Sequence, residues 1–253
     1  RETVKILKNE LKDDETQVAC IGPAGQNLVA FGCIMFNTYN AAARGGTGML
    51  MGAKRLKAIA VRGSKPFTVY DPKEFDRLAV ALRHDLSKDT GAVRLSNFGT
   101  AGIINTVNTG YALPSYNFQE NHIEGAYEIS GEKLNEGKYL KRRSGCGSCG
   151  IGCHRYTEVD EGKHKGTYAG GPEFETLSAL GSGCGIVDMA AVLKGNELCN
   201  IYGMDTISAG SVIQWAMECM QRGVLSSADT DGLDLIFGNS DALIEMLTKI
   251  AYR

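Results

Sequence analysis

Three closely spaced cysteines constrain this chain more than any other feature of its sequence. Cys146, Cys149 and Cys153 form a C-x2-C-x3-C pattern inside a glycine-rich run. One short loop can present several thiolates to a compact centre, and its glycines let the backbone turn around that centre and point N–H groups at sulfur. The spacing favours an iron–sulfur cluster. Because a cubane cluster usually takes four ligands, we expect a fourth from Cys184, Cys199 or a cysteine beyond the end of the chain.

Other interpretations of the cysteines stay open on spacing alone. Zinc is the rival metal, with His154 as a possible ligand, although the second ligand pair typical of zinc sites is absent from the sequence. The third cysteine disfavours a thioredoxin-like redox pair. A purely structural role for the loop is the remaining alternative.

Composition limits the partners that the chain can have. Its 253 residues carry a net charge of −2, which gives no general attraction to nucleic acid or to an anionic membrane. No apolar run approaches the ~20 residues that span a bilayer, and no signal-like segment opens the chain. Nothing suggests export, so we expect a cytoplasmic protein, and in that reducing compartment its eight cysteines would be metal ligands, reactive thiols or core residues rather than disulfides. The first residue is not methionine and the last ones keep helical periodicity, so we expect a piece of a longer polypeptide.

Hydrophobic patterns divide the chain near residue 66 into an α/β segment and a mainly helical domain. In the first part they predict a helix at residues 1–12 and strands at 17–21, 28–36 and 56–61. In the second part they predict helices at residues 74–86, 187–202, 208–222 and 241–252, with long ordered loops in 87–145. The residues expected in the core because of their apolar surroundings include Cys20, Cys33, Cys184, Cys199, Cys219 and Trp215.

Two further segments have the composition of binding sites. Residues 40–48 combine glycines with Arg44, which suits an anionic group, although a plain glycine-rich turn between strands explains them equally well. Residues 170–176 place Glu173 and Glu175 after a Gly-Pro turn, at the start of a small-residue helix. Acids there are usually helix caps, and the alternative is a buried acid or base beside a cofactor.

Taken together, these motifs resemble the tungsten-containing aldehyde:ferredoxin oxidoreductase family. The matching runs lie in order at residues 21–28, 41–48, 51–61, 146–153, 171–175 and 196–208. Ordered motifs along nearly the whole chain are far more specific than the cysteines alone. The resemblance implies a fragment of a multidomain pterin enzyme. Residues 1–66 would be the C-terminal part of its α/β pterin-binding domain, and residues 67–253 its mainly helical domain with the iron–sulfur cluster loop.

The resemblance also implies cofactors and site residues. Family members bind tungsten, or sometimes molybdenum, through two pyranopterins beside a [4Fe-4S] cluster. Cys146, Cys149 and Cys153 would be cluster ligands, and Glu175 matches an acid near the metal. The residue matching Ala41 offers a backbone carbonyl to a magnesium ion that bridges the pterin phosphates. The pterin-contacting positions on this match are Asn40, Ala41, Ala42, Ala43, Arg44, Asn200, Gly203, Met204 and Asp205.

Some positions depart from the family pattern. Asn40 stands where some members have arginine, and Asn200 where aspartate is common. Some members bridge a dimer with a metal held by an E-x-x-H helix motif. Here the matching stretch is Lys194-Gly-Asn-Glu197, which does not fit that motif. The resemblance therefore implies a possible homodimer without the bridging metal site.

The function implied by the resemblance is oxidation of a small aldehyde to a carboxylic acid. Electrons would leave through the cluster to ferredoxin or an electron-transfer subunit, and we expect the fragment to be inactive alone. Within the family, the alternative is a class II benzoyl-CoA reductase-type catalytic subunit. From a different class, the alternative is a zinc-stabilised, non-catalytic binding module.

Overall fold

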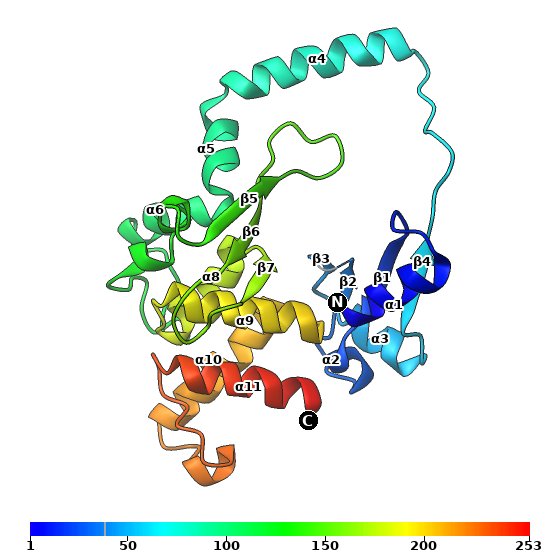
Figure 1. Cartoon of the computed structure of the whole chain (residues 1–253). Helices are drawn as coiled ribbons and strands as arrows, with labels where there is room; N and C mark the ends of the chain where they lie inside the picture. Colours follow the sequence, from blue (N-terminus) through cyan, green and yellow to red (C-terminus); the bar gives the residue numbers. More distant parts are fainter. Residues whose placement is uncertain (38) are drawn as a thin grey trace.

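The computed structural model describes residues 1–37 and 39–253, and its first part is an α/β unit around a small antiparallel sheet (Figure 1). The four strands lie in the order β3-β2-β1-β4, so β1 is central and pairs with both β2 and β4. The elements of this part are α1 (Glu2–Leu11), β1 (Gln17–Ile21), α2 (Pro23–Gln26), β2 (Ile34–Phe36), β3 (Asn40–Ala42), α3 (Thr47–Ala53) and β4 (Ala58–Val61).

The predicted strand at residues 28–36 is wrong in its first half. Only Ile34–Phe36 joins the sheet, and Leu28 has a left-handed φ of 58°. The reason is tertiary, because the backbone of Gly32 and Cys33 pairs with Met204 and Gly203 of the helical part instead of with a strand. The other predicted strands and the first helix are confirmed within two or three residues.

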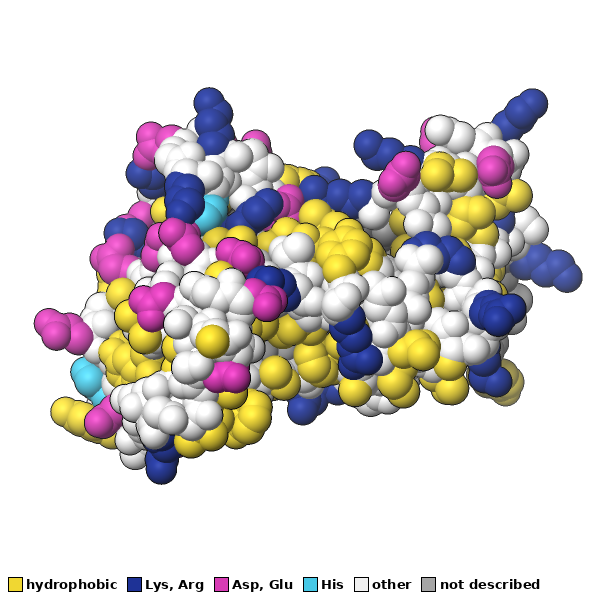
Figure 2. Space-filling model, turned by 90° about the horizontal axis from the view of Figure 1, so that it is seen from below, with side chains coloured by type: hydrophobic (Ala, Val, Ile, Leu, Met, Phe, Trp, Pro, Cys, Tyr) yellow, Lys and Arg dark blue, Asp and Glu magenta, His cyan; other side chains and the backbone are white. Residues whose placement is uncertain are grey.

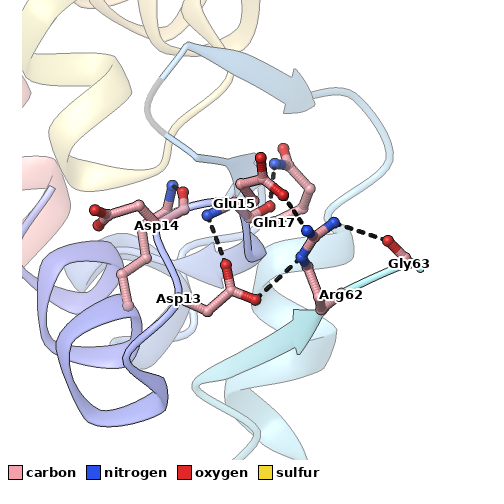
Figure 3. A network of polar contacts seen from close by, with 7 residues as sticks. Asp13, Asp14, Glu15, Gln17, Arg62 and Gly63 are labelled. Carbon is pink, nitrogen blue, oxygen red and sulfur yellow. Dashed lines mark hydrogen bonds and ion pairs between the residues drawn. The ribbon is translucent and has the colours of Figure 1, made fainter.

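An exposed ion network closes the edge of this unit (Figure 3). Nε of Arg62, just after β4, lies 3.0 Å from Oδ2 of Asp13, and the same guanidinium also bonds Glu15 and donates to the Gly63 carbonyl at 2.8 Å. These side chains connect the α1–β1 loop to the end of β4. Their exposure means that solvent screens the pairs, so they add little stability.

Four α-helices and two short 3-10 helices lie in the described stretch between the last strand of the first sheet and residue 140. Helix α4 (Pro72–Lys88) has no buried residue and stands away from the body at the end of an extended connection from β4 (Figure 1). Asp71 and Asp89 cap α4 and α5 by accepting backbone N–H bonds. The stretch 87–145 was expected to be mixed and to include long loops, and it contains α5 (Thr90–Phe98), η1 (Thr100–Ile103), α6 (Ile104–Thr109), η2 (Ala126–Ile129) and α7 (Gly131–Asn135). Residues 110–125 form a long loop without helix or strand, as expected.

A second antiparallel sheet, which the sequence patterns did not predict, carries the cysteine motif. Its strands are β5 (Leu140–Ser144), β6 (His154–Glu158) and β7 (Tyr168–Gly170), in that order. Residues 145–153, here called the cysteine loop, connect β5 to β6. Ser144 pairs with His154 at the base of this loop, so the sheet fixes both of its ends.

The C-terminal helices form the main core. They are α8 (Phe174–Leu180), η3 (Ser182–Cys184), α9 (Met189–Tyr202), α10 (Thr206–Gln221), η4 (Ser227–Thr230) and α11 (Ser240–Tyr252). Asp188, Asp205 and Asn239 cap the three long ones, which confirms the predicted helices within two residues at each end. The α/β first part and the helical remainder confirm the predicted fold class.

The core assignments from sequence are mostly correct. All five cysteines outside the motif are buried. Trp215 is not, because α10 turns Ile213 and Met217 into the core and leaves the indole 60% exposed. Hydrophobic side chains also reach the surface on the face seen from below (Figure 2).

Within the described residues, no single helix is long and apolar enough to cross a membrane. The segments Phe174–Cys184 and Met189–Tyr202 meet the length and composition criterion only as a pair, and that pair is bent by 119°.

Candidate functional site

The α/β part and the helical part meet through their backbones. The Cys33 N–H donates to the Gly203 carbonyl at 2.8 Å, and the Asp205 N–H donates to the Phe31 carbonyl at 3.1 Å. We call this pairing of residues 31–33 with 203–205 the seam. It fixes the motif that contains Asn200, Gly203, Met204 and Asp205 against the first sheet, although the two segments lie far apart in the sequence.

Glycines allow the close approach at the seam. A Cβ on Gly22 would lie 2.2 Å from the Tyr202 carbonyl oxygen, which is closer than any real contact. Gly203 ends α9 with a left-handed φ of 69°, a conformation that favours glycine. Both residues are therefore required by the packing of α9 against the turn that follows β1.

Asp205 connects the seam to the loop that follows β3. Its side chain is 3% exposed, and its Oδ2 lies 3.0 Å from Nη1 of Arg44. The same oxygen accepts the N–H of Ser208 at 3.0 Å and so caps α10. Asp205 thus holds Arg44, the only cation of the predicted pterin loop, against the start of a helix.

A cavity of about 290 Å³ brings the two predicted pterin segments together. Asn40, Ala41 and Ala43 line it from one side, and Asn200 and Met204 from the other. Ala42, Arg44, Gly203 and Asp205 lie in the same two segments but outside the lining. The rest of the wall comes from residues that were not expected to contact a pterin; they are Tyr39, His154, Gly170, Gly171, Glu173, Thr176, Asn196 and Thr206.

His154 connects this cavity to the cysteine loop, because it follows Cys153 directly and lines the cavity. Its ring packs against Tyr156 with centroids 5.0 Å apart. Its Nε2 is buried and has no hydrogen-bond partner among the described residues. Burial lowers the pKa of the imidazole, so the neutral ring is favoured. An unpaired buried nitrogen at a cavity wall is a suitable contact for a bound polar group.

The two acids after the Gly-Pro turn face different cavities. Glu173 lines the cavity described above, and its Oε2 accepts a hydrogen bond from the Thr100 hydroxyl at 2.5 Å. Glu175 is exposed in the first turn of α8 and lines a smaller cavity of about 120 Å³ with Phe118, Phe174 and Ile207. The backbone at the start of α8 thus points the two carboxylates to different sides. The spacing of the two acids in the sequence could not predict this.

The cysteine loop is curled but open to solvent. The Cys149 N–H donates to the Cys146 carbonyl at 3.0 Å, and both thiols are exposed. Backbone N–H groups of Ile151 and Gly152 bond the Cys149 sulfur and lower its pKa. Burial, followed by the Glu173 charge, raises the pKa of Cys153. Backbone donors aimed at a sulfur suit a thiolate ligand of a cluster. Among the described residues, however, the three thiols of the loop are not grouped closely enough to hold a metal ion.

The alternative ligands named from sequence lie elsewhere. Cys184 and Cys199 are buried in the helical core, and burial raises the pKa of both thiols well above their ordinary value. In the part of the chain that the structure describes, no three or more His, Cys, Asp or Glu side chains are grouped to hold a metal ion. The ring of His154 contacts Tyr39 and Tyr156.

The helix motif that replaces E-x-x-H forms a salt bridge. Glu197 is 4% exposed, and its carboxylate bonds Nζ of Lys194 at 2.8 Å and Nη1 of Arg1 at 3.0 Å. The Tyr168 N–H donates to the same carboxylate at 3.1 Å. The Lys194 ammonium thus supplies positive charge beside Glu197.

Comparisons with known proteins define the class to which this fold and site belong. The family model for the N-terminal domain of aldehyde ferredoxin oxidoreductase matches residues 1–63, and the model for domains 2 and 3 matches residues 77–253. The chain therefore belongs to the aldehyde ferredoxin oxidoreductase family.

Among its relatives, the tungsten-containing aldehyde ferredoxin oxidoreductase of Pyrococcus abyssi is 41% identical over 257 residues, covering all of this chain and 41% of the relative. An aliphatic sulfonate oxidoreductase WOR-like subunit of Pyrococcus furiosus is 29% identical, covering 93% of this chain and 37% of that protein. The chain thus spans about two fifths of the length of these relatives.

A solved structure has the same fold over the full chain. It is the active-site complex BamBC of benzoyl coenzyme A reductase with 1,5-dienoyl-CoA. The TM-score is 0.76 at 25% sequence identity, with 100% of this chain and 39% of that chain covered. The likeness extends through both parts of this chain, so it supports their arrangement across the seam.

Proposed function

We propose that this chain is part of an oxidoreductase that oxidises small aldehydes to carboxylic acids. Electrons would pass through a [4Fe-4S] cluster to ferredoxin or an electron-transfer subunit. The observation that carries the proposal is the cavity that Asn40 and Ala41 share with Asn200 and Met204, because His154 extends its wall to the cysteine loop. Similarity over the whole of this chain to a part of the tungsten-containing aldehyde ferredoxin oxidoreductases supports the same proposal.

Each proposed cofactor has residues that would hold it. Cys146, Cys149 and Cys153 would bind the cluster, with the fourth ligand from a cysteine outside this chain. The Ala41 carbonyl would bind magnesium between the pterin phosphates; it lies on β3, an edge strand whose outer backbone groups are not paired within the sheet. A tungsten or molybdenum bis-pyranopterin would supply two-electron chemistry. The proposed pterin contacts are Asn40, Ala41, Ala42, Ala43, Arg44, Asn200, Gly203, Met204 and Asp205.

The chain's own groups would orient that cofactor and exclude water. The carboxylate of Asp205 fixes Arg44, which leaves the guanidinium 61% exposed and available to an anion. Nε2 of His154 offers one further hydrogen bond within the cavity. These contacts need little rearrangement, since the seam already holds both segments in place.

Glu175 is the proposed group that moves a proton during turnover. The Glu175→Gln variant of the complete enzyme should lose aldehyde oxidation at least a hundredfold, because an amide cannot accept the proton. Tungsten and iron contents should remain those of the wild type. Glu245→Gln is the matched control, since this exposed glutamate of α11 lines neither of the two cavities. Full activity in Glu175→Gln would remove Glu175 from the mechanism.

A benzoyl-CoA reductase-type activity is the second candidate. The fold shared with BamBC favours it. Anaerobic assays of the complete enzyme with aldehydes and, separately, with aromatic coenzyme A thioesters distinguish the two reactions. Reduction of the thioester with no aldehyde oxidation would reject the first proposal.

Metal analysis tests the non-catalytic alternative. A zinc-stabilised binding module would contain zinc and lack the broad visible absorption of an iron–sulfur cluster. We expect iron and sulfide together with that absorption. Zinc without it would reject the redox function.

Three further assignments belong to the same proposal. We place the boundary between the two domains at residues 66 and 67, in the extended connection between β4 and α4. All eight cysteines are free thiols, which supports a cytoplasmic location. A homodimer, if formed, would lack the bridging metal, because Lys194 already pairs with Glu197.

A further inference from the structure

Arg155 is a buried cation next to the cysteine loop, and nothing in the proposed function uses it. It is 2% exposed and is one of the largest fully buried side chains in the molecule. It lies on β6, two residues after Cys153. Long charged side chains are rarely buried unless they are paired, so its position needs an explanation.

The guanidinium bonds backbone carbonyls from two elements. Nη1 donates to the Cys153 carbonyl at 2.6 Å, and Nη2 donates to the Ser96 carbonyl at 2.9 Å and to the Leu95 carbonyl at 3.5 Å. Ser96 and Leu95 belong to the last turn of α5, where carbonyls carry partial negative charge. Arg155 thus fastens the end of the cysteine loop to the C-terminus of α5.

The site is shaped around this side chain. Gly99 follows α5 with a φ of +61°, and a Cβ there would lie 3.1 Å from both Cζ of Arg155 and the Cys153 carbonyl oxygen. A side chain there would be crowded against the guanidinium and the loop, and the positive φ also favours glycine. Both Arg155 and the Gly99 backbone therefore contribute to this contact.

The positive charge is not neutralised by an ion pair. Across residues 1–37 and 39–253, no carboxylate oxygen lies within 4.0 Å of the Arg155 nitrogens. Glu173 acts on Arg155 only from a longer distance, and its carboxylate already bonds Thr100. A buried cation held only by neutral carbonyls is costly, and a nearby anionic group would offset that cost.

We propose that Arg155 is a positioning residue for the cysteine loop and that its charge raises the reduction potential of the cluster bound there. This inference rests on the proposed cluster. Potentials of such clusters depend on nearby charge, hydrogen bonding and solvent exposure, and a buried cation favours the reduced, more negative state. The fork of the guanidinium reaches the loop and α5 together, which a lysine ammonium cannot do in the same geometry.

A redox titration of the complete enzyme, followed by electron paramagnetic resonance, tests this role. Arg155→Gln should shift the ratio of reduced to oxidised cluster about tenfold toward the oxidised form at a fixed potential, which is ~59 mV for a one-electron couple. Arg143→Gln is the matched control. Arg143 pairs with Arg155 across β5 and β6 and also contacts the Ser96 carbonyl, but it is exposed. Its midpoint should equal that of the wild type.

Arg155→Lys separates positioning from charge. Both variants should lose part of the bound iron, because neither side chain can hold the carbonyls of Cys153 and of α5 together. The cluster that remains in Arg155→Lys should keep a midpoint near that of the wild type, because the charge is retained. An unchanged midpoint in Arg155→Gln would overturn the role of Arg155. If that variant does not fold, full iron content in Arg155→Lys would overturn it instead. A wild-type enzyme without any cluster signal would instead reject the proposed cluster, and this inference with it.

Discussion

The seam and the cysteine loop differ in how much of their shape the chain itself determines. At the seam, backbone hydrogen bonds join residues 31–33 to 203–205, and Gly22 touches the Tyr202 carbonyl. In the cysteine loop, two of the three thiols are exposed, and a Cβ on Gly147 would meet nothing within 4 Å. The seam is complete without a ligand, whereas the loop is anchored at its base and otherwise open.

This difference suggests separate roles for the seam and the cysteine loop. A preformed seam can hold a cofactor in a fixed orientation, since its groups need no rearrangement on binding. An open loop of thiols gains its order from a metal, because the metal–sulfur bonds replace packing. Substitutions should therefore affect folding at the seam and metal content at the loop.

The largest effect on stability is expected from Gly22→Ala. The added methyl would overlap the Tyr202 carbonyl, so α9 must shift away from the first sheet. Overpacking of this kind should lower the free energy of unfolding by about 3 kcal/mol. Urea denaturation followed by circular dichroism measures the change.

Gly147→Ala is the matched control in the cysteine loop, where the same methyl enters open space. It should unfold like the wild type. Equal loss of stability in the two variants would contradict the contrast between a packed seam and an open loop.

A smaller effect is expected from Glu197→Gln, in α9 shortly before the seam. Burial alone would raise the pKa of Glu197, but hydrogen bonds from Lys194 and the Tyr168 N–H, with the Lys194 and Arg1 charges, hold it below its ordinary value. Because the folded-state pKa is depressed, the carboxylate stabilises the protein above its unfolded pKa of ~4.3, and this stability is lost as the pH falls. Since Lys194 and Arg1 are partly exposed, the cost at neutral pH should be about 1–2 kcal/mol.

Urea denaturation of Glu197→Gln and of the wild type from pH ~3 to ~7, a range that brackets carboxyl titration, measures this difference in stability. The gap between the two proteins should shrink as the pH drops. Glu245→Gln, at an exposed position on α11, should show no such gap at any pH. A gap that widens toward low pH would contradict the assigned ion pairs.

Local sequence patterns were sufficient to predict much of this fold, but not the contacts between its parts. The long C-terminal helices were predictable because Asp188, Asp205 and Asn239 supply caps before apolar periodic runs. Strand β5 was not, since its sequence LKRRS lacks alternating apolar residues and is exposed along most of its length. The seam could not be predicted either, because pairing between Cys33 and Gly203 leaves no local periodicity.

The candidate site divides in the same way. The family resemblance implied that Asn40, Ala41, Asn200 and Met204 belong to one site, and these four residues line one cavity. The roles suggested for Glu173 and His154 needed coordinates, because the direction of each side chain depends on the sheet and the helix start that carry it. The Gly-Pro turn alone could not distinguish Glu173 from Glu175, and only the family resemblance pointed to Glu175.

The smallest effect on the fold is expected from Cys149→Ser. The thiol is exposed, and its sulfur accepts hydrogen bonds from the N–H groups of Ile151 and Gly152. A serine oxygen can accept the same bonds. The thermal midpoint of the metal-free protein should therefore not change measurably. The complete enzyme, in contrast, should lose most of its cluster iron, because a serine hydroxyl is a poor replacement for a thiolate ligand. Differential scanning calorimetry and iron analysis on the same preparation measure both quantities. A variant that keeps its iron would show that Cys149 is not a ligand, and one that unfolds early without metal would show that the cysteine loop is packed after all.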